Sequence, residues 1–269
     1  MKIATWNVNS VKARLAAITA WLKEAEPDVA ALQEIKSTEE TFPVEAFEDL
    51  GYNVAVFGQK SYNGVALLAK RPFEDVTRGL VGDGEGEARY IEALVPGDGG
   101  MVRVASIYAP NGNGADGNVP ASGSAEAHKF AHKLDWMEKL RARAEELLTY
   151  EEPLVLAGDF NVIPKDEDCY DPAFWSKSAL TQPEARSALR RIENLGFTDA
   201  FRTKHAEPGA YSFWDYQGGA WEKDRGIRID FLLLSPQALD RLEDCAIDKA
   251  VRGGPKPSDH APQWCRLKA

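Results

Sequence analysis

Short apolar runs separated by turn residues recur along the whole chain. Their length and their content of β-branched residues predict strands rather than helices. So many strands require either two sheets or one very large sheet. The runs are KIATWNVN, DVAALQE, NVAVFG, GVALLAK, RYIEALV, MVRVASIYAP, LVLAGDFN, IRIDFLLLS and APQWCRL.

Three longer segments carry apolar residues at helical spacing, and they predict helices over residues 11–26, 124–148 and 183–196. Gly196 is the expected stop of the third helix. With helices placed between strands, the pattern predicts α/β layers around a double-sheet core. The residues expected to share a helix face are Val11, Leu15, Ile18 and Leu22 in the first segment, and Phe130, Leu134, Met137 and Leu140 in the second.

Glycine-rich segments over residues 81–88, 96–100 and 109–124 are expected to be surface loops, because strand-like runs resume directly after each one. No internal repeat or low-complexity tail is evident. A single domain over residues 1–269 is the expected organisation.

The composition is that of an ordinary globular protein, with 44% hydrophobic residues and a mean hydropathy of -0.38. The N-terminal run lacks the apolar stretch of a signal peptide and no later run is long enough to span a membrane, so we expect a cytoplasmic protein. Cys169, Cys245 and Cys265 are odd in number and far apart, which predicts buried thiols and neither a disulfide framework nor a zinc site.

The net charge of -10 argues against tight nonspecific binding to a polyanion, which depends on neutralising phosphates. A phosphate-bearing substrate remains compatible with this charge if basic side chains cluster locally and a divalent cation bridges carboxylates to phosphate. Binding would then depend on salt and on metal.

Polar residues end several of the apolar strands, where α/β folds gather ligand-binding side chains. Asn7, Glu34, Asp159 and Asn161 are such residues. Each also has a simpler interpretation: Asn7 as a cap, Glu34 as a solvated side chain, Asp159 as a turn former. Asp230 differs, because a carboxylate inside an apolar strand needs a partner.

His260 is the partner that the sequence offers to Asp230, although a structural salt bridge and a capped turn at 259–260 are alternatives. Carboxylates, amides and one imidazole from separate strand ends are the parts of a Mg²⁺ site. Hydrolysis of a phosphate ester needs such an ion, a base to activate water, and donors to the non-bridging oxygens.

The motifs WNVNS, LQE, YAPNG, GDFN, RIDFLLLS and SDHAP occur in this order. In this respect the chain resembles the exonuclease III family of abasic-site endonucleases, within the endonuclease/exonuclease/phosphatase superfamily. The resemblance implies a DNase I-like fold, a four-layer αββα sandwich with two packed mixed β-sheets. It also implies a site at one end of the paired sheets.

The resemblance further implies roles for individual residues. Glu34 would be the principal Mg²⁺ ligand, with Asn7 and Asp259 near the ion and Mn²⁺ as a possible substitute. Asp159 would activate water or protonate the leaving group, two proposals that stay open. The remaining catalytic residues would be Asn161, which places the water and the phosphate, Tyr108, which faces the scissile phosphate, and His260, which contacts it while held by Asp230.

For the substrate, the resemblance implies an apolar pocket of Phe213, Ile227 and Ile229 that admits a base-less sugar, where the simpler interpretation is core packing. Arg89 and Asn111 would also bind substrate. Further basic residues that could meet a DNA backbone are Lys60, Lys165, Arg225 and Arg228.

The implied activity is Mg²⁺-dependent cleavage 5′ to abasic sites in duplex DNA, with 3′→5′ exonuclease and 3′-phosphatase or 3′-repair diesterase activities, by a monomer. The implied partner is duplex DNA with abasic or 3′-blocked sites. The alternative is a catalytically silent, nuclease-like regulator associated with RNA, which would have lost catalytic residues or filled the pocket. The matched positions keep competent side chains, which favours the enzyme.

Overall fold

Two six-stranded sheets form the centre of the computed structural model, which describes residues 1–83 and 86–269. The expected loop over 81–88 includes residues 84 and 85, which lie outside the described residues. In spatial order, the first sheet contains β11 (Leu242–Ile247), β12 (Gln263–Leu267), β1 (Lys2–Asn7), β2 (Val29–Gln33), β4 (Val65–Ala69) and β3 (Asn53–Phe57). The second contains β5 (Glu74–Arg78), β6 (Tyr90–Gly97), β7 (Gly100–Tyr108), β8 (Leu154–Asp159), β10 (Asp230–Leu234) and β9 (Thr198–Asp199).

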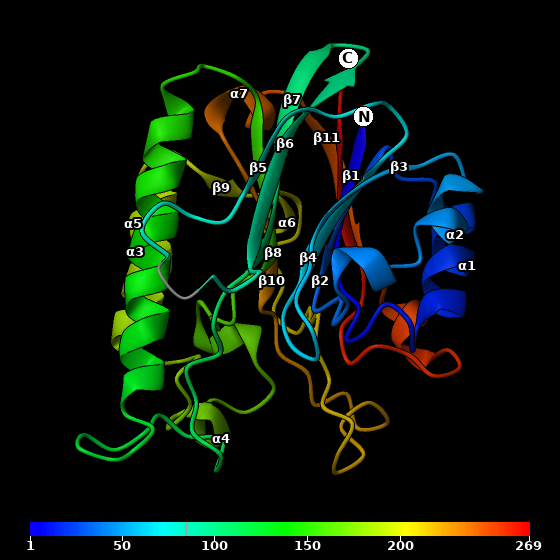
Figure 1. Ribbon diagram of the computed structural model, residues 1–269. Coiled ribbons are helices and arrows are strands. Elements are labelled where there is room, and N and C mark those ends of the chain that lie inside the picture. The colour runs from blue at the N-terminus through cyan, green and yellow to red at the C-terminus, as the bar shows by residue number, and fades with distance from the viewer. Residues whose placement is uncertain (84–85) are drawn as a thin grey trace.

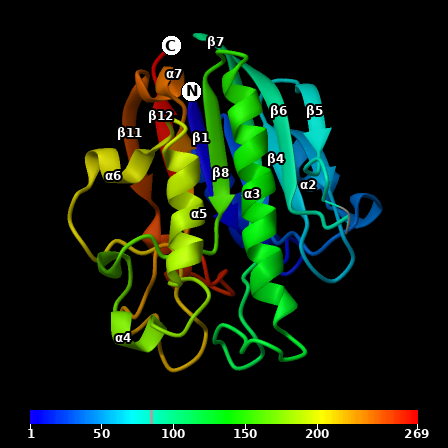
Figure 2. The ribbon, with the colours of Figure 1, turned by 90° about the vertical axis from the view of Figure 1, so that its left-hand side faces the viewer.

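Helices cover the outer face of each sheet, so the molecule has four layers (Figure 1 and Figure 2). The helices α1 (Leu15–Ala25) and α2 (Val44–Glu48) pack on the first sheet, and α3 (His128–Leu148) and α5 (Pro183–Glu193) pack on the second. This confirms the predicted αββα fold. The remaining short helices are α4 (Pro172–Trp175), α6 (Ala200–Lys204), α7 (Pro236–Leu239), η1 (Glu39–Thr41), η2 (Asp166–Asp168) and η3 (Lys249–Gly253).

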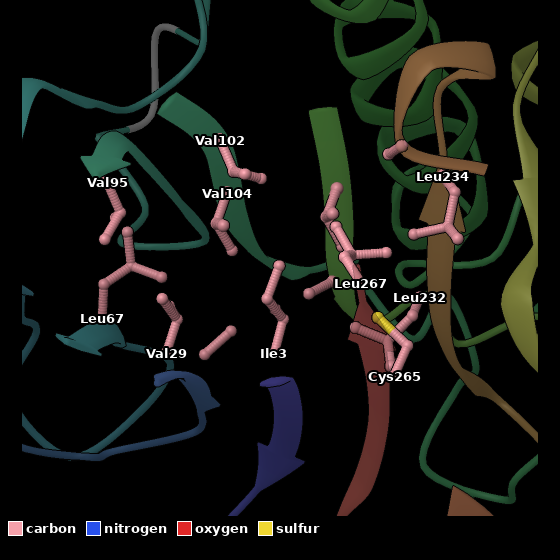
Figure 3. Packing of buried hydrophobic residues seen from close by; sticks show 14 of the residues in the cluster. Ile3, Val29, Leu67, Val95, Val102, Val104, Leu232, Leu234, Cys265 and Leu267 are labelled. Atoms are coloured by element: carbon pink, nitrogen blue, oxygen red, sulfur yellow. The ribbon is translucent and has the colours of Figure 1, made fainter. Parts of the chain in front are cut away.

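The strict alternation of side chains along each strand produces these layers. In β1, Ile3 points toward the second sheet, whereas Ala4 and Trp6 point toward α1. The inner side chains of both sheets meet in one apolar layer that Figure 3 shows from close by. Its labelled members are Ile3, Val29, Leu67, Val95, Val102, Val104, Leu232, Leu234, Cys265 and Leu267.

Three strands were not expected from the sequence. β5 and β11 are edge strands with a polar, half-exposed pattern, and β9 has only two residues. Such strands obtain their conformation from the neighbour that they pair with, so hydrophobic alternation does not reveal them. The glycine-rich segment 96–100 is mostly strand, because β6 and β7 pair as far as Gly97 and Gly100.

The two halves of the chain repeat one topology. Each half begins with a parallel pair joined by a helix, β1–α1–β2 and β7–α3–β8, and continues with an antiparallel pair, β3–β4 and β9–β10. Each half ends with a second antiparallel pair, β5–β6 or β11–β12, and this pair joins the sheet of the other half. Accordingly, β6 pairs with β7 and β12 pairs with β1.

The parallel pairs position the site. Because parallel strands end at the same edge of a sheet, the residues that follow β1, β2, β7 and β8 gather at one end of the molecule. Figure 2 shows β8 pointing toward this end, which also carries α4, while both chain termini lie at the opposite end. No helix of the described residues is long and apolar enough to cross a membrane.

Candidate active site

Polar side chains from both sheets meet where the parallel strands end. Asn7 is the last residue of β1, and Glu34 directly follows β2. Asp159 ends β8 and lies opposite Tyr108 of β7 and Asp230 of β10 in the sheet register. The residues that the sequence separates by more than two hundred positions are therefore brought together in space.

The carboxamide of Asn7 joins the two sheets. Its Nδ2 group donates to Oε1 of Glu34 at 2.9 Å and to Oδ2 of Asp159 at 3.0 Å. Asn7 and Asp159 are fully buried, and Glu34 is partly exposed. One amide thus fixes the separation of two carboxylates that come from different sheets.

His260 lies between two further carboxylates. Its Nδ1 atom is 2.8 Å from Oδ2 of Asp230, and its Nε2 atom is 3.8 Å from Oδ2 of Asp159. Ser212 also donates to Oδ2 of Asp230, at 2.6 Å. The predicted pairing of Asp230 with His260 is confirmed, and it explains how β10 tolerates a buried acid.

Burial and charge set the protonation of this group. Burial alone would lower the pKa of His260, but the adjacent negative charge of Asp230 and its hydrogen bond raise it to about 10. Burial raises the pKa of Asp159, and the positive charge of His260 opposes that rise. Burial would also raise the pKa of Glu34, but Lys36, 2.9 Å from Oε2, lowers it overall.

Local turns hold these side chains in place. Oδ1 of Asp159 accepts a hydrogen bond from the backbone N–H of Asn161, and Oδ1 of Asn7 accepts one from that of Asn9. The interpretation of Asp159 as a turn former is therefore confirmed. Glu34 and Asn161 have φ values of 49° and 51°, in the left-handed region, a strained conformation that clusters at functional sites.

A divalent cation fits this arrangement. Ligand atoms of Glu34, Asp159 and His260 lie within 4.8 Å of one another. Carboxylate oxygens are ligands that Mg²⁺ accepts, whereas a protonated imidazole cannot bind a metal. We therefore assign potential metal contacts to the carboxylates. Asp259, another predicted neighbour of the ion, accepts a hydrogen bond from Nδ2 of Asn9 at 3.0 Å.

A cavity of about 410 Å³ opens above these groups. Phe213, Ile227 and Ile229 line it on one side, and the ring of Phe213 meets the imidazole of His260 edge-on at 4.9 Å. Ile227 and Ile229 are buried and pack with Leu180. The two isoleucines are therefore both core residues and part of the cavity wall, and the half-buried Phe213 packs against them. Other lining residues are Glu34, Tyr108, Asn111, Asp159, Trp175 and Asp259.

The model of the Endonuclease/Exonuclease/phosphatase family matches residues 4–260. The chain belongs to this family. Exodeoxyribonuclease III of Haemophilus influenzae is 33% identical over the full length of both proteins. An AP endonuclease structure from Archaeoglobus fulgidus is 35% identical with a TM-score of 0.91, and each chain covers all of the other.

A structure of the 3′ phosphatase NExo from Neisseria bound to a product DNA hairpin is 34% identical with a TM-score of 0.90, again over both complete chains. These similarities confirm the resemblance inferred from the motifs. The chain is a hydrolase of the nuclease type.

Asn111 and Arg89, the other two residues predicted to bind substrate, differ in their position relative to the cavity. Asn111 lines the cavity and donates to Oδ1 of Asn161 at 3.1 Å. Arg89 lies outside the cavity wall, with its guanidinium 4.9 Å from the centre of the Tyr108 ring. Glu87 forms an ion pair with Arg89, so the clearest contact of Arg89 with the site is the one to the Tyr108 ring.

The prediction that Arg228 could contact a DNA backbone is wrong. The structure buries it, 1% exposed, with Nε 2.8 Å from Asp168 and Nη1 2.6 Å from Asp199. Its position between two isoleucines of the cavity wall gives it a structural role. Lys60, Lys165 and Arg225 are exposed, as expected.

Lys133 is a residue that the sequence analysis missed. It is fully buried in α3, and its ammonium donates to the backbone carbonyls of Pro110, Asn111 and Asn161 at 3.0, 3.1 and 2.6 Å. It thereby holds the loops after β7 and β8 together beneath the cavity. A signal was present, because Lys133 falls on the apolar stripe three residues after Phe130.

Proposed function

We propose that the chain is a DNA repair nuclease that uses Mg²⁺, or Mn²⁺ in its place, to hydrolyse the phosphodiester 5′ to an abasic site in duplex DNA. The same centre would act as a 3′→5′ exonuclease and as a 3′-phosphatase or 3′-repair diesterase. We propose further that the protein acts as one domain and as a monomer. The observation that carries the proposal is the Asn7 bridge between Glu34 and Asp159 beside the His260–Asp230 pair.

Each of these residues has a task in the reaction. A bound Mg²⁺ would offset the charge of the phosphate near Glu34, with Asn7 and Asp259 close by. His260 would donate its Nε2–H to a non-bridging oxygen, because Asp230 occupies Nδ1 and keeps the ring charged. Tyr108 would face the same phosphate from the cavity wall.

Asp159 would act on the attacking water or on the leaving oxygen. Its raised pKa suits exchange of a proton near neutral pH and is compatible with either role. Asn161 lies two residues further on and would hold the water or the phosphate. The new bond joins the water oxygen to phosphorus, and the broken bond releases the 3′-hydroxyl of the preceding nucleotide.

The apolar wall would select the substrate. Phe213, Ile227 and Ile229 offer no hydrogen bonds from their side chains, so an extrahelical sugar without a base would be favoured there. A normal nucleotide would have to place its base elsewhere. Arg89 would contribute through Tyr108, and Asn111 through Asn161.

A cleavage assay tests the proposal. The substrate is a duplex oligonucleotide with one internal tetrahydrofuran abasic analogue, compared with an undamaged duplex, with and without EDTA. We expect metal-dependent incision at the lesion that disappears in Asp159→Ala but persists in Asp49→Asn, a change of an exposed carboxylate. A folded protein that cleaves neither substrate with Mg²⁺ or Mn²⁺ would instead favour the RNA-associated regulator.

A further inference from the structure

A second hollow of about 330 Å³ adjoins the catalytic cavity. Three residues, Trp175, Phe213 and Asp215, line both spaces and form the wall between them. A ligand bound in the cavity could therefore extend into the hollow. The other lining residues are Tyr170, Phe174, Gln217, Gly218, Ala220 and Arg225.

Phe174 presents an unusually exposed aromatic ring to this hollow. Its exposed fraction is 67%, although it belongs to the short helix α4 at the end of the molecule that carries the site (Figure 1). Oδ1 of Asp171 accepts hydrogen bonds from the backbone of Ala173 and Phe174, which fixes the helical turn. The Trp175 ring meets that of Phe174 edge-on at 5.4 Å.

The backbone of Phe174 is therefore fixed before any ligand arrives, and its ring rests against that of Trp175. An ordered ring loses little conformational entropy when a flat ligand stacks on it. Isolated exposed apolar residues are common and need no explanation. Here, however, the exposed ring borders a hollow with further aromatic walls.

The charges around the hollow balance each other. The guanidinium of Arg225 lies 5.9 Å from the centre of the Tyr170 ring. Asp215 supplies one negative charge, and its Oδ1 atom accepts from the backbone of Gln217 at 2.7 Å. Aromatic faces with one charge of each sign suit an uncharged flat ring with donors and acceptors, and they suit a phosphate poorly.

We propose that this hollow binds the nucleobase of a 3′-terminal nucleotide whose sugar and phosphate lie in the catalytic cavity, an inference that rests on the proposed function. The two spaces share a wall, so one glycosidic bond can lead from one into the other. A terminal base gives up stacking on one side only. An internal base would give up stacking on both sides, and either base gives up its pairing.

The hollow then separates two classes of substrate at one catalytic centre. An abasic site or a base-less 3′ end has nothing to place against Phe174. A base-bearing 3′ end gains a stacking surface there. Exonuclease activity should therefore depend on Phe174, whereas abasic-site incision should not.

Three duplexes test this inference with the full-length protein: one with an internal tetrahydrofuran site, one with an ordinary 3′-terminal nucleotide, and one with a 3′-terminal tetrahydrofuran nucleotide. In Phe174→Ala, kcat/KM on the ordinary end should fall about tenfold, because one base–aromatic stack is lost. The two base-less substrates should be cleaved as by the wild type. Tyr150→Ala, which removes another half-exposed ring, is the control.

Binding is measured separately with 2-aminopurine at the 3′ terminus and the Asp159→Ala variant, which prevents turnover. Stacking on Phe174 should quench the fluorescence, and the added Phe174→Ala change should restore it. Circular dichroism verifies that the variants fold.

Several outcomes would overturn the subsite. One is an equal fall in the kcat/KM of Phe174→Ala on all three duplexes, and another is an unchanged kcat/KM on all three. The third is a wild-type protein that incises the abasic duplex but does not degrade base-bearing 3′ ends. Failure of the wild type on every duplex would instead refute the proposed function.

Discussion

His260 donates from Nδ1 to Oδ2 of Asp230 over 2.8 Å, and both side chains are almost completely buried. The acid lies at the start of β10 and the imidazole precedes β12, so the pair links the two sheets. Burial disfavours the charged ring, and the carboxylate more than compensates. The protonation of His260 therefore depends mainly on Asp230, while the charges of Asp159 and Asp259 also raise its pKa.

Asp230→Asn should change the pH dependence of cleavage. In the wild type the pKa of His260 is about 10 in the folded chain and about 6.5 in the unfolded chain, so its charge persists at neutral pH. This pair stabilises the fold fully below about pH 6.5, and the stabilisation is lost as the pH rises toward 10. Without the acid, burial should lower the pKa of His260.

In the variant, kcat/KM should therefore decline as the pH rises through neutral, while the wild type retains its activity there. The measurement is kcat/KM on the abasic duplex from about pH 5 to about pH 9. Identical profiles for the two proteins would show that His260 does not act as a charged donor.

Glu34→Gln should weaken the use of metal. The substitution keeps the shape of the side chain but removes the charge that faces the Asn7 amide and Lys36. We expect the Mg²⁺ concentration for half-maximal cleavage to rise by about tenfold or more. Glu40→Gln, at an exposed position, is the control. An unchanged Mg²⁺ requirement would remove Glu34 from the proposed metal site.

Lys133→Met should impair catalysis more than substrate binding. The change keeps an unbranched stem but leaves three carbonyls, two of them in buried hydrogen bonds, without this donor, at a cost on the order of 3 kcal/mol in stability. With Asn161 less well held, kcat should fall by about tenfold or more. Lys129→Met, one turn earlier and partly exposed, should behave like the wild type.

Gly112→Ala gives an independent test of the same contact. Gly112 has a φ of +86°, and an added Cβ would lie 2.7 Å from Cδ of Lys133. We expect the same loss of kcat, measured on the abasic duplex. A normal kcat in both variants would show that the loop positions do not depend on the lysine.

Arg228→Met should destabilise the fold. It removes the buried arginine that pairs with Asp168 and Asp199, although Asp168 keeps Arg202 at 2.6 Å, and breaking a buried ion pair costs about 3–5 kcal/mol. Urea denaturation measures the difference, with Arg190→Met as the exposed control. A change below about 1 kcal/mol would place this network among ion pairs that contribute little.

The sequence predicted most of the fold, because the central strands and the three long helices carry strong apolar patterns. The sequence did not predict β5, β9 and β11, because short or polar edge strands obtain their conformation from the strands that they pair with. In the site, Asp230 was predictable because a carboxylate in an apolar run demands explanation. Arg228 was misjudged because nothing local distinguishes a buried arginine from a solvated one, and its acids come from distant segments.

The exchanged strand pairs tie the assembly of the site to the completion of the fold. β5 and β6 come from the first half of the chain but belong to the second sheet. β11 and β12 come from the second half but belong to the first sheet. Neither half can complete its own sheet, so we expect unfolding in one cooperative step. Asn7 and Glu34 come from one sheet and Asp159 and Asp230 from the other, while His260 arrives with the last strand. A partly folded chain would therefore lack an assembled active site. We expect no nuclease activity until the final strand has joined the first sheet.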